Sequence, residues 1–312
     1  MPIETAALLE ALDSVTAIPI IPFNGRQVDY AGHAKNVDYL MKNNYLSDRR
    51  PRVIAIAGTS LIHHISPKDQ TRLIDITGQR MGRDGVLISG LTPNPLAVAG
   101  ELVEAQSRLE RPPDAYLVMP LTGIYSPQGL YEEYMHFAET YGKSCNARFI
   151  YYFRQAQDLA TVIRLIHDSP HFIGVKVGTG EADIRPLVEG VGDSGMVIWG
   201  IGDRCTKAAE LGARGHTSGI AVVYARASDE INNAQRRGDY ETSRRIEAEL
   251  SALEEIRFMN GRIYNYSAVV EAMNASGFDD IVGGTGGPFN PPVPPEIAEA
   301  VREAIKNLKQ YH

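Results

Sequence analysis

Eight short apolar segments alternate with segments of helical spacing along this chain of 312 residues. The apolar segments are predicted strands at residues 14–20, 52–57, 85–90, 114–120, 147–153, 172–177, 196–200 and 214–220, the last of them weak. Most are almost continuously apolar, as parallel strands are when helices cover both faces of their sheet. This order predicts an α/β fold, a (β/α)8 TIM barrel whose parallel strands close into a ring inside the helices.

The chain after residue 225 is predicted to be helical, with helices at 227–237, 240–259, 266–276 and 294–308. We therefore expect a barrel over residues 1–225 and a C-terminal helical region over residues 226–312 that packs on it. A Gly- and Pro-rich loop at 283–292 separates the last two helices, but it is too short to be a domain boundary. The alternative is a doubly wound open sheet, and against it no predicted helix opens with a Gly-x-Gly-x-x-Gly turn.

Charge and composition argue against several classes of function. The chain has 31 Lys and Arg against 38 Asp and Glu, a formal charge of -7, which is unfavourable for a nucleic-acid or anionic membrane surface. No apolar run approaches the roughly 18 residues of a membrane span, and the start of the sequence lacks the pattern of a signal peptide. Cys145 and Cys205 form neither a disulfide framework nor a zinc motif. We expect a cytoplasmic protein without nucleic-acid or membrane partners.

The sixth predicted strand carries the lysine on which the functional argument depends. Lys176 lies within the apolar run 172–177, which then breaks into the turn Gly178-Thr179-Gly180. Burial in apolar surroundings lowers the pKa of an ammonium group, and a neutral amine can attack a ketone to form a Schiff base. The ordinary alternative is a lysine at a strand end that reaches water or pairs with a carboxylate.

Other strand ends would meet Lys176 at one mouth of the barrel. Tyr152 on the neighbouring strand would place a phenol beside the amine, where it could move protons during imine formation. The turn Gly58-Thr59-Ser60 offers two hydroxyls and backbone N–H groups to a carboxylate. The alternatives are a packing aromatic and an ordinary strand-to-helix turn. The turn 200–203 suggests a phosphate nest, although the carboxylate of Asp203 would repel a phosphate.

These residues resemble the dihydrodipicolinate synthase and N-acetylneuraminate lyase superfamily of class I aldolases. The similarity covers about residues 14–308 and includes Thr16–Phe23, Gly58–Ser60, Tyr152, Phe172–Lys176 and Gly286–Pro292. It implies that Lys176 forms a Schiff base with pyruvate or another 2-oxo acid and that Tyr152 transfers protons. It also implies that Gly58, Thr59 and Ser60 hold the substrate carboxylate, that no metal or organic cofactor is needed, and that the chain forms a homodimer or homotetramer.

The sequence departs from the family pattern next to the carboxylate turn. The family usually continues Gly-Thr-Thr-Gly-Glu, whereas this chain reads Gly58-Thr-Ser-Leu-Ile-His63-His64 and so lacks a carboxylate. His63 and His64 are candidates for substrate contact or proton transfer, because a histidine titrates near neutral pH. The alternative is an exposed loop pair, and no third ligand with suitable spacing suggests a metal site.

Further departures fall on positions that set specificity in the family. A tyrosine that reaches into the neighbouring subunit's site corresponds to Thr122, with Tyr125 as its candidate replacement, and the arginine of diaminopimelate-pathway synthases corresponds to about Gln157. Arg154 is a candidate to bind an anionic substrate tail, or is a solvent-facing side chain. Thr217 on the eighth strand is a further candidate substrate contact.

These departures predict a divergent lyase and not a true lysine-pathway dihydrodipicolinate synthase. It would cleave, condense or dehydrate another 2-oxo acid, such as a sugar-derived acid or an aryl or alkyl pyruvate. The alternative is a catalytically altered barrel that binds a small 2-oxo acid as a sensor or structural subunit. A phosphate-binding barrel enzyme is a third hypothesis.

Overall fold

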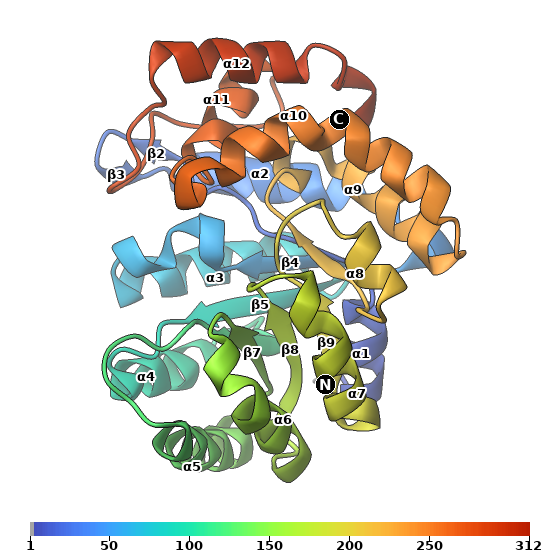
Figure 1. The fold of residues 1–312 in the computed structure, drawn as a ribbon. Helices are drawn as coiled ribbons and strands as arrows, with labels where there is room; N and C mark the ends of the chain where they lie inside the picture. Colours follow the sequence, from blue (N-terminus) through green and yellow to red (C-terminus); the bar gives the residue numbers. More distant parts are fainter. Residues whose placement is uncertain (1–2) are drawn as a thin grey trace.

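In a computed structural model that describes residues 3–312, eight parallel strands close into a barrel (Figure 1). Around the ring the order is β1, β10, β9, β8, β7, β6, β5 and β4, which is the order of the strands along the chain. Their bounds are β1 Val15–Ala17, β4 Arg52–Ile56, β5 Gly85–Leu91, β6 Ala115–Val118, β7 Phe149–Phe153, β8 Phe172–Val177, β9 Met196–Trp199 and β10 His216–Ser218. The predicted (β/α)8 barrel is confirmed.

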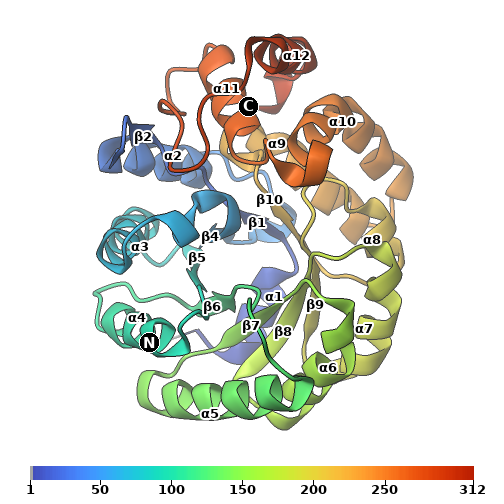
Figure 2. The ribbon, with the colours of Figure 1, turned by 60° about the vertical axis from the view of Figure 1, so that its left-hand side comes forward.

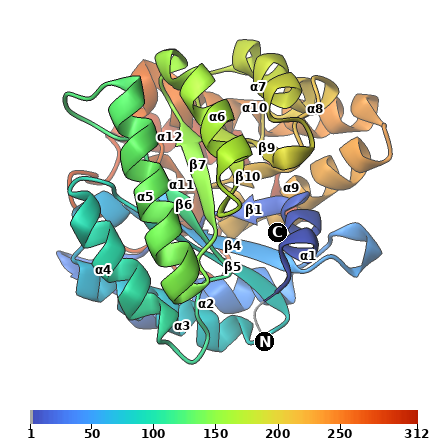
Figure 3. The ribbon, with the colours of Figure 1, turned by 90° about the horizontal axis from the view of Figure 1, so that it is seen from below.

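A helix follows each barrel strand, and neighbouring helices pack side by side around the outside (Figure 2 and Figure 3). They are α2 Tyr30–Lys42, α3 Pro67–Met81, α4 Leu96–Ser107, α5 Pro127–Cys145, α6 Leu159–Asp168, α7 Ile184–Val191, α8 Thr206–Glu210 and α9 Ala221–Arg236, and α1 Thr5–Leu12 precedes β1. Ser66 caps α3 as its sequence predicts, because its Oγ accepts the N–H of Asp69 at 3.1 Å and Pro67 follows it.

Side chains of alternate strand positions fill the inside of the barrel. A small cavity there is lined by Thr16, Ile18, Ala55, Ile88, Leu117, Ile150, Lys176, Ile198 and Thr217. It measures about 10 Å³, about the room that one water molecule needs. The barrel is therefore a packed core with a single lysine among its mostly apolar lining.

The C-terminal helices lie together on one side of the barrel (Figure 1). They are α10 Tyr240–Arg262, α11 Ser267–Ala275 and α12 Pro295–Ile305. Tyr266 donates its hydroxyl to Ile21 O at 2.9 Å, and Thr285 N–H donates to Phe23 O at 2.9 Å. The Gly- and Pro-rich loop is thus held against the barrel.

Two features differ from the expected elements. A short hairpin of β2 Phe23–Asn24 and β3 Gln27–Val28 precedes α2, where no strands were predicted. Helix α9 begins at Ala221, so the predicted division at residues 225 and 226 falls inside a barrel helix. The division itself stays a prediction, and its start at residue 1 lies outside the described residues. Within residues 3–312, no helix has the length and apolar character needed to cross a membrane.

Candidate active site

Lys176 and Tyr152 lie next to each other inside the barrel. They are paired across the neighbouring strands β8 and β7, because Tyr152 is in register with Lys176. Nζ of Lys176 lies 3.9 Å from the centre of the Tyr152 ring, and the two residues are 4% and 8% exposed. The pairing that strand alternation predicts is therefore present in the structure.

The surroundings of Lys176 favour its neutral form. Within residues 3–312 it forms no ion pair with a carboxylate, and the ionisable groups that act on it are Tyr152, Arg154 and Arg262. Burial lowers the pKa of Lys176 below its ordinary value, and the positive charges of Arg154 and Arg262 lower it further, while Tyr152 opposes them. Neither alternative role, reaching water or pairing with an acid, fits this side chain.

At Tyr152, burial and the neighbouring positive charges shift the pKa in opposite directions. Burial raises the pKa of Tyr152, but the positive charge of Lys176 in its protonated form, together with those of Arg154 and Arg262, outweighs burial and brings the pKa down to about 8. A phenol that titrates near neutral pH can both give and accept a proton during a reaction. The pair can therefore supply a nucleophile and a proton carrier in one place.

Gly178, just beyond β8, permits this arrangement. A Cβ atom added at Gly178 would lie 2.5 Å from Cε2 of Tyr152 and 2.6 Å from Cδ of Arg154. Both distances are shorter than a carbon–carbon contact allows, so only glycine lets the chain pass this close to the ring.

The turn after β4 forms a single 3₁₀ turn over Gly58–Ser60. Ser60 donates its hydroxyl to Pro19 O at 2.7 Å and its N–H to Ala57 O at 2.8 Å, so both of its donors are used within the protein. In this structure these donors are therefore occupied, and the role of Ser60 as a carboxylate donor stays a prediction. Thr59 has only a long hydroxyl contact of 3.4 Å with Ile18 O, and the first N–H groups of such a turn have no partner within it.

Comparison with known proteins shows the family of this chain. A family model described as "Dihydrodipicolinate synthetase family" matches residues 11–308. The chain belongs to the dihydrodipicolinate synthetase family. A 4-hydroxy-tetrahydrodipicolinate synthase of Pseudomonas putida (strain W619) is 26% identical over 240 residues, which cover 73% of this chain and 76% of the relative.

Solved structures of the family share the fold at low sequence identity. Dihydrodipicolinate synthase from Bacillus clausii superimposes with a TM-score of 0.86 at 20% identity, over 97% of this chain and 99% of that chain. A chloride-inhibited dihydrodipicolinate synthase from Acinetobacter baumannii, complexed with pyruvate, gives a TM-score of 0.79 at 22% identity, over 94% and 97% of the two chains. Members of this family are lyase- or aldolase-type enzymes and are typically oligomeric.

The dihydrodipicolinate synthetase fold brings one further candidate, Thr217, to the amine. Thr217 is 5% exposed and lines the same small cavity as Lys176. His63 and His64, in contrast, are exposed, and no hydrogen bond or ring contact joins either of them to Lys176 or Tyr152 in the part of the chain that the structure describes. Their role at the reacting centre stays a prediction.

The histidine pair lies against the late Gly- and Pro-rich loop. The ring of His64 lies 4.8 Å from that of Phe289, and the rings of His63 and His64 are 6.3 Å apart. Partial burial lowers the pKa of His63, and the neighbouring His64 lowers it further. Among residues 3–312, no group of three or more His, Cys, Asp or Glu side chains has a geometry that could hold a metal ion.

The candidate replacement for the family's second tyrosine is held away from the amine. Tyr125 donates its hydroxyl to Oδ2 of Asp158 at 3.0 Å, and Tyr151 donates to the same oxygen at 3.1 Å. Because Tyr151 precedes Tyr152 on β7, its side chain points to the opposite face of the strand. Tyr125 therefore lies on the helix side of β7 and not beside Lys176.

Acidic groups lie at the turn 200–203, where the sequence suggests a phosphate nest. Asp203 is fully buried and accepts the hydroxyl of Ser218 at 2.6 Å, and His216 Nε2 lies 3.3 Å from its other oxygen. A Cβ at Gly202 would lie 2.3 Å from Oε2 of Glu254. Two carboxylates against this turn make it unfit for a phosphate, which argues against the third hypothesis.

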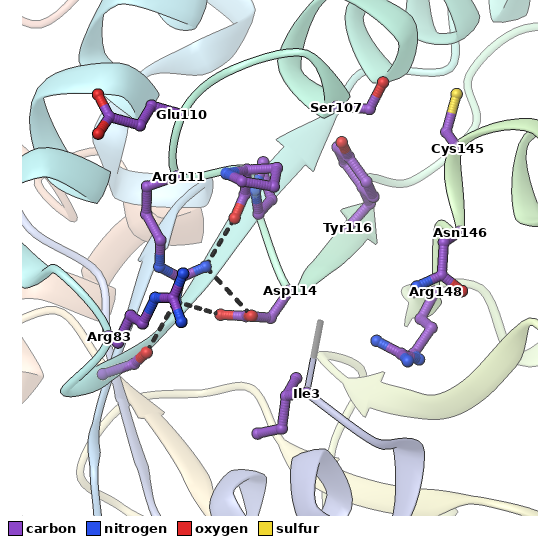
Figure 4. Close-up of a pocket in the computed structure, with 13 residues that line it drawn as sticks. Ile3, Arg83, Ser107, Glu110, Arg111, Asp114, Tyr116, Cys145, Asn146 and Arg148 are labelled. Carbon is purple, nitrogen blue, oxygen red and sulfur yellow. Dashed lines mark hydrogen bonds and ion pairs between the residues drawn. The ribbon is translucent and has the colours of Figure 1, made fainter. Parts of the chain in front are cut away.

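A separate pocket of about 480 Å³ opens at the other end of the barrel (Figure 4). It is lined by residues at the amino-terminal ends of strands, among them Gly85, Tyr116 and Arg148. Arg111 in this pocket donates from Nη2 to Oδ2 of Asp114 at 2.7 Å. Since barrel enzymes carry their chemistry at the carboxyl ends of the strands, we do not assign the reaction to this pocket.

Two arginines at the barrel mouth were missed by the sequence reasoning. Arg262 donates from Nη2 to Gly178 O at 3.1 Å, and Arg204 lies close to it on the loop after β9. Asn260 and Gly261 have φ angles of 48° and 75°, which turn the end of α10 toward the barrel mouth. The Asn-Gly pair was the available signal, because both residues tolerate positive φ.

Proposed function

We propose that this chain is a lyase that acts on pyruvate or another 2-oxo acid through a Schiff base on Lys176. The observation that carries the proposal is a buried lysine that has no acidic partner among residues 3–312, with a tyrosine ring 3.9 Å away. Family membership and the pyruvate complex of the Acinetobacter baumannii relative support the same substrate class.

In the proposed reaction, the neutral amine of Lys176 attacks the ketone carbon of the substrate. The new C–N bond forms as the carbonyl π electrons move to oxygen, and Tyr152 carries a proton from nitrogen to that oxygen. Tyr152 then gives its own proton to the departing hydroxyl group, so that the C–O bond breaks, water leaves and a protonated imine remains beside the phenolate. This imine accepts electron density from the neighbouring carbon. Bond cleavage, condensation and dehydration next to the former ketone all become accessible from this intermediate.

The substrate carboxylate is proposed to bind across the mouth from Lys176. Strand β4 lies opposite β8 in the ring of eight, so the turn after β4 faces the amine. Thr59 and the N–H groups of Gly58 and Thr59 are the proposed donors, and Thr217 is a further contact. Because the cavity at Lys176 holds about one water molecule, a substrate enters only when side chains at the mouth shift.

We propose that the physiological substrate is not that of lysine biosynthesis. The sequence lacks the family's usual Glu after the carboxylate turn, and Thr122 and Gln157 stand at positions that the synthases use for specificity. Tyr125, the candidate replacement for the second tyrosine, is bound to Asp158. These same losses favour the second candidate function, a barrel that binds a 2-oxo acid without turning it over.

Trapping with borohydride tests the proposal. The protein is incubated with pyruvate, reduced with borohydride and examined by mass spectrometry, and we expect a covalent adduct on a peptide that contains Lys176. Lys176→Ala should lose the adduct, whereas Lys207→Ala should keep it, because Lys207 is an exposed side chain of helix α8. A folded protein that forms no adduct with any 2-oxo acid would contradict the enzyme and favour the binding role.

Assembly and location follow from the family as proposals. We propose a homodimer or homotetramer, since family members are typically oligomeric. Sedimentation equilibrium of the purified chain measures this, and a monomer at micromolar concentration would contradict it. The cytoplasmic location stays a prediction.

A further inference from the structure

Two arginines lie over the Lys176 and Tyr152 pair. Arg154 follows β7 directly, is exposed, and has its Cζ 5.8 Å from the centre of the Tyr152 ring. Arg262 is half-buried at the turned end of α10 and donates to Gly178 O at 3.1 Å. Figure 2 shows the end of α10 beside the strand ends of the barrel. Both guanidinium groups therefore stand where a substrate has to enter.

A third arginine, Arg204, lies beside Arg262 on the ring of Phe258. Cζ of Arg204 lies 4.5 Å from the centre of that ring, and Cζ of Arg262 lies 5.4 Å from it. Arg257 also lies near the ring, but Glu254 neutralises it in a buried ion pair. Arg204 is exposed and has no such partner among the described residues. We call Arg154, Arg204 and Arg262 the arginine rim.

The arginine rim brings together three guanidinium groups whose charges are not balanced by ion pairs. Some exposed arginines elsewhere form ion pairs, such as Arg80 with Asp38 and Arg244 with Glu210, and others form none among the described residues. Within residues 3–312 no member of the rim pairs with a carboxylate, although the chain as a whole has a formal charge of -7. Burial lowers the pKa of Arg262, and repulsion from Arg154 and Arg204 lowers it further. An anion would remove this repulsion.

The position of the rim relative to the carboxylate turn sets the shape of that anion. Arg154 follows β7 and Arg204 follows β9, on either side of β8, whereas the turn 58–60 follows β4 on the opposite side of the ring. A 2-oxo acid with its first carboxylate at β4 and its ketone at Lys176 would have its far end over the rim. A guanidinium group binds a carboxylate through two parallel hydrogen bonds.

We infer that the substrate is a dicarboxylic 2-oxo acid, whose second carboxylate is held at its far end by Arg154, Arg204 and Arg262. This inference rests on the proposed function, since it names the substrate class of the same site. The competing explanation is that the rim acts only on Lys176 and Tyr152, by shifting their pKa values. That effect would change imine formation equally for every 2-oxo acid.

Matched pairs of 2-oxo acids separate the two explanations. The concentration that gives half-maximal borohydride trapping is measured for 2-oxoglutarate against 2-oxopentanoate, and for 2-oxoadipate against 2-oxohexanoate. Each pair has the same carbon number, and only one member has a distal carboxylate. The wild type is compared with Arg262→Gln, Arg204→Gln and the double variant. Arg245→Gln, on an exposed face of the same helix α10, is the control.

We expect the wild type to trap at least one dicarboxylic acid at a roughly tenfold lower concentration than its monocarboxylic match. Arg262→Gln and Arg204→Gln should reduce that ratio, and the double variant should bring it near one, while Arg245→Gln leaves it unchanged. Ratios near one in the wild type, with pyruvate still trapped, would overturn the inference and leave the proposed function intact. A rim variant that raises the concentration for half-maximal trapping equally for all acids would also overturn it. Absence of every adduct, including that of pyruvate, would overturn both.

Discussion

Gly200 faces the side chain of Lys176 so closely that a methyl group at position 200 would lie 2.9 Å from both Cγ and Cε of the lysine. The same methyl group would lie 2.4 Å from the backbone oxygen of Val177. Gly200 directly follows β9, the strand beside β8, so the glycine and the lysine come from neighbouring strands. Because Gly200 has no side chain, the side chain of Lys176 can pass close to the end of strand β9.

Gly200→Ala should impair imine formation more than it impairs folding. The added methyl group has to displace the stem of Lys176, and crowding of a packed interior typically costs about 1–3 kcal/mol of the free energy of unfolding. We expect the rate of borohydride trapping with pyruvate to fall by roughly tenfold or more, as a displaced reacting group loses its geometry. Denaturant unfolding and trapping kinetics measure the two effects.

Gly180→Ala is the matched control for this substitution. Gly180 lies in the turn after β8, and a Cβ atom there would meet nothing within 4 Å. Its backbone is extended, so alanine fits without strain. A trapping rate in Gly200→Ala equal to that of Gly180→Ala would show that the lysine tolerates the methyl group.

Tyr152→Phe should slow imine formation and leave the fold in place. Loss of a group that transfers protons typically costs on the order of 10²-fold in rate, and the phenyl ring still fills the same space. Tyr151→Phe is the control, because its hydroxyl binds Asp158 on the other face of β7 and should affect stability by only about 1 kcal/mol. Equal trapping rates in the two variants would show that Tyr152 only packs against the amine.

The pH dependence of trapping gives a second test of Tyr152. Its pKa of about 8 means that the phenol loses its proton as the pH rises through that value. If the phenol delivers the proton to the carbinolamine oxygen, the wild-type rate should fall above about pH 8, and Tyr152→Phe should not show this decrease. A decrease at the same pH in both proteins would assign it to another group.

Lys176→Met should stabilise the protein at low and neutral pH. Because burial lowers the pKa of Lys176 in the folded state, the unfolded chain binds its proton more tightly. The stability of the wild type therefore rises with pH between the lowered folded pKa and the ordinary value, and its deficit relative to the variant is greatest at low pH. We expect Lys176→Met to be more stable by about 1 kcal/mol or more at pH 6. If Lys176→Met is less stable than the wild type at this pH, the buried ammonium group of Lys176 does not destabilise the folded protein.

The parts of this protein that could be predicted from sequence are those that depend on local periodicity. Apolar runs and helix caps such as Ser66 indicated the barrel, and strand alternation placed Tyr152 beside Lys176. Contacts between distant segments could not be read in this way. The hydroxyl of Ser60 is used by Pro19, 41 residues away, and Arg262 reaches Gly178 across 84 residues. Only the folded chain shows which donors are already occupied and which charges meet.

The ion pair of Arg52 and Asp229 is another such contact, and it gives the last prediction. Both side chains are fully buried, and the guanidinium group donates to the two carboxylate oxygens at 2.8 and 2.6 Å. Arg52 also donates to Asn43 O at 2.7 Å and to Leu40 O at 3.2 Å, so the pair joins β4, the end of α2 and helix α9. Such a pair is expensive to break, because the remaining charge stays buried without compensation.

Asp229→Ala should therefore lower the free energy of unfolding by about 3–5 kcal/mol. Asp38→Ala is the control, because its pair with Arg80 is half-exposed at both ends and should contribute roughly 0–1 kcal/mol. Urea denaturation of the two variants at neutral pH measures the difference. Equal destabilisation would mean that water reaches the Arg52 guanidinium group once its partner is removed. Because Arg52 begins β4 while Gly58 follows its other end, Asp229→Ala that still folds should trap pyruvate at a rate near that of the wild type.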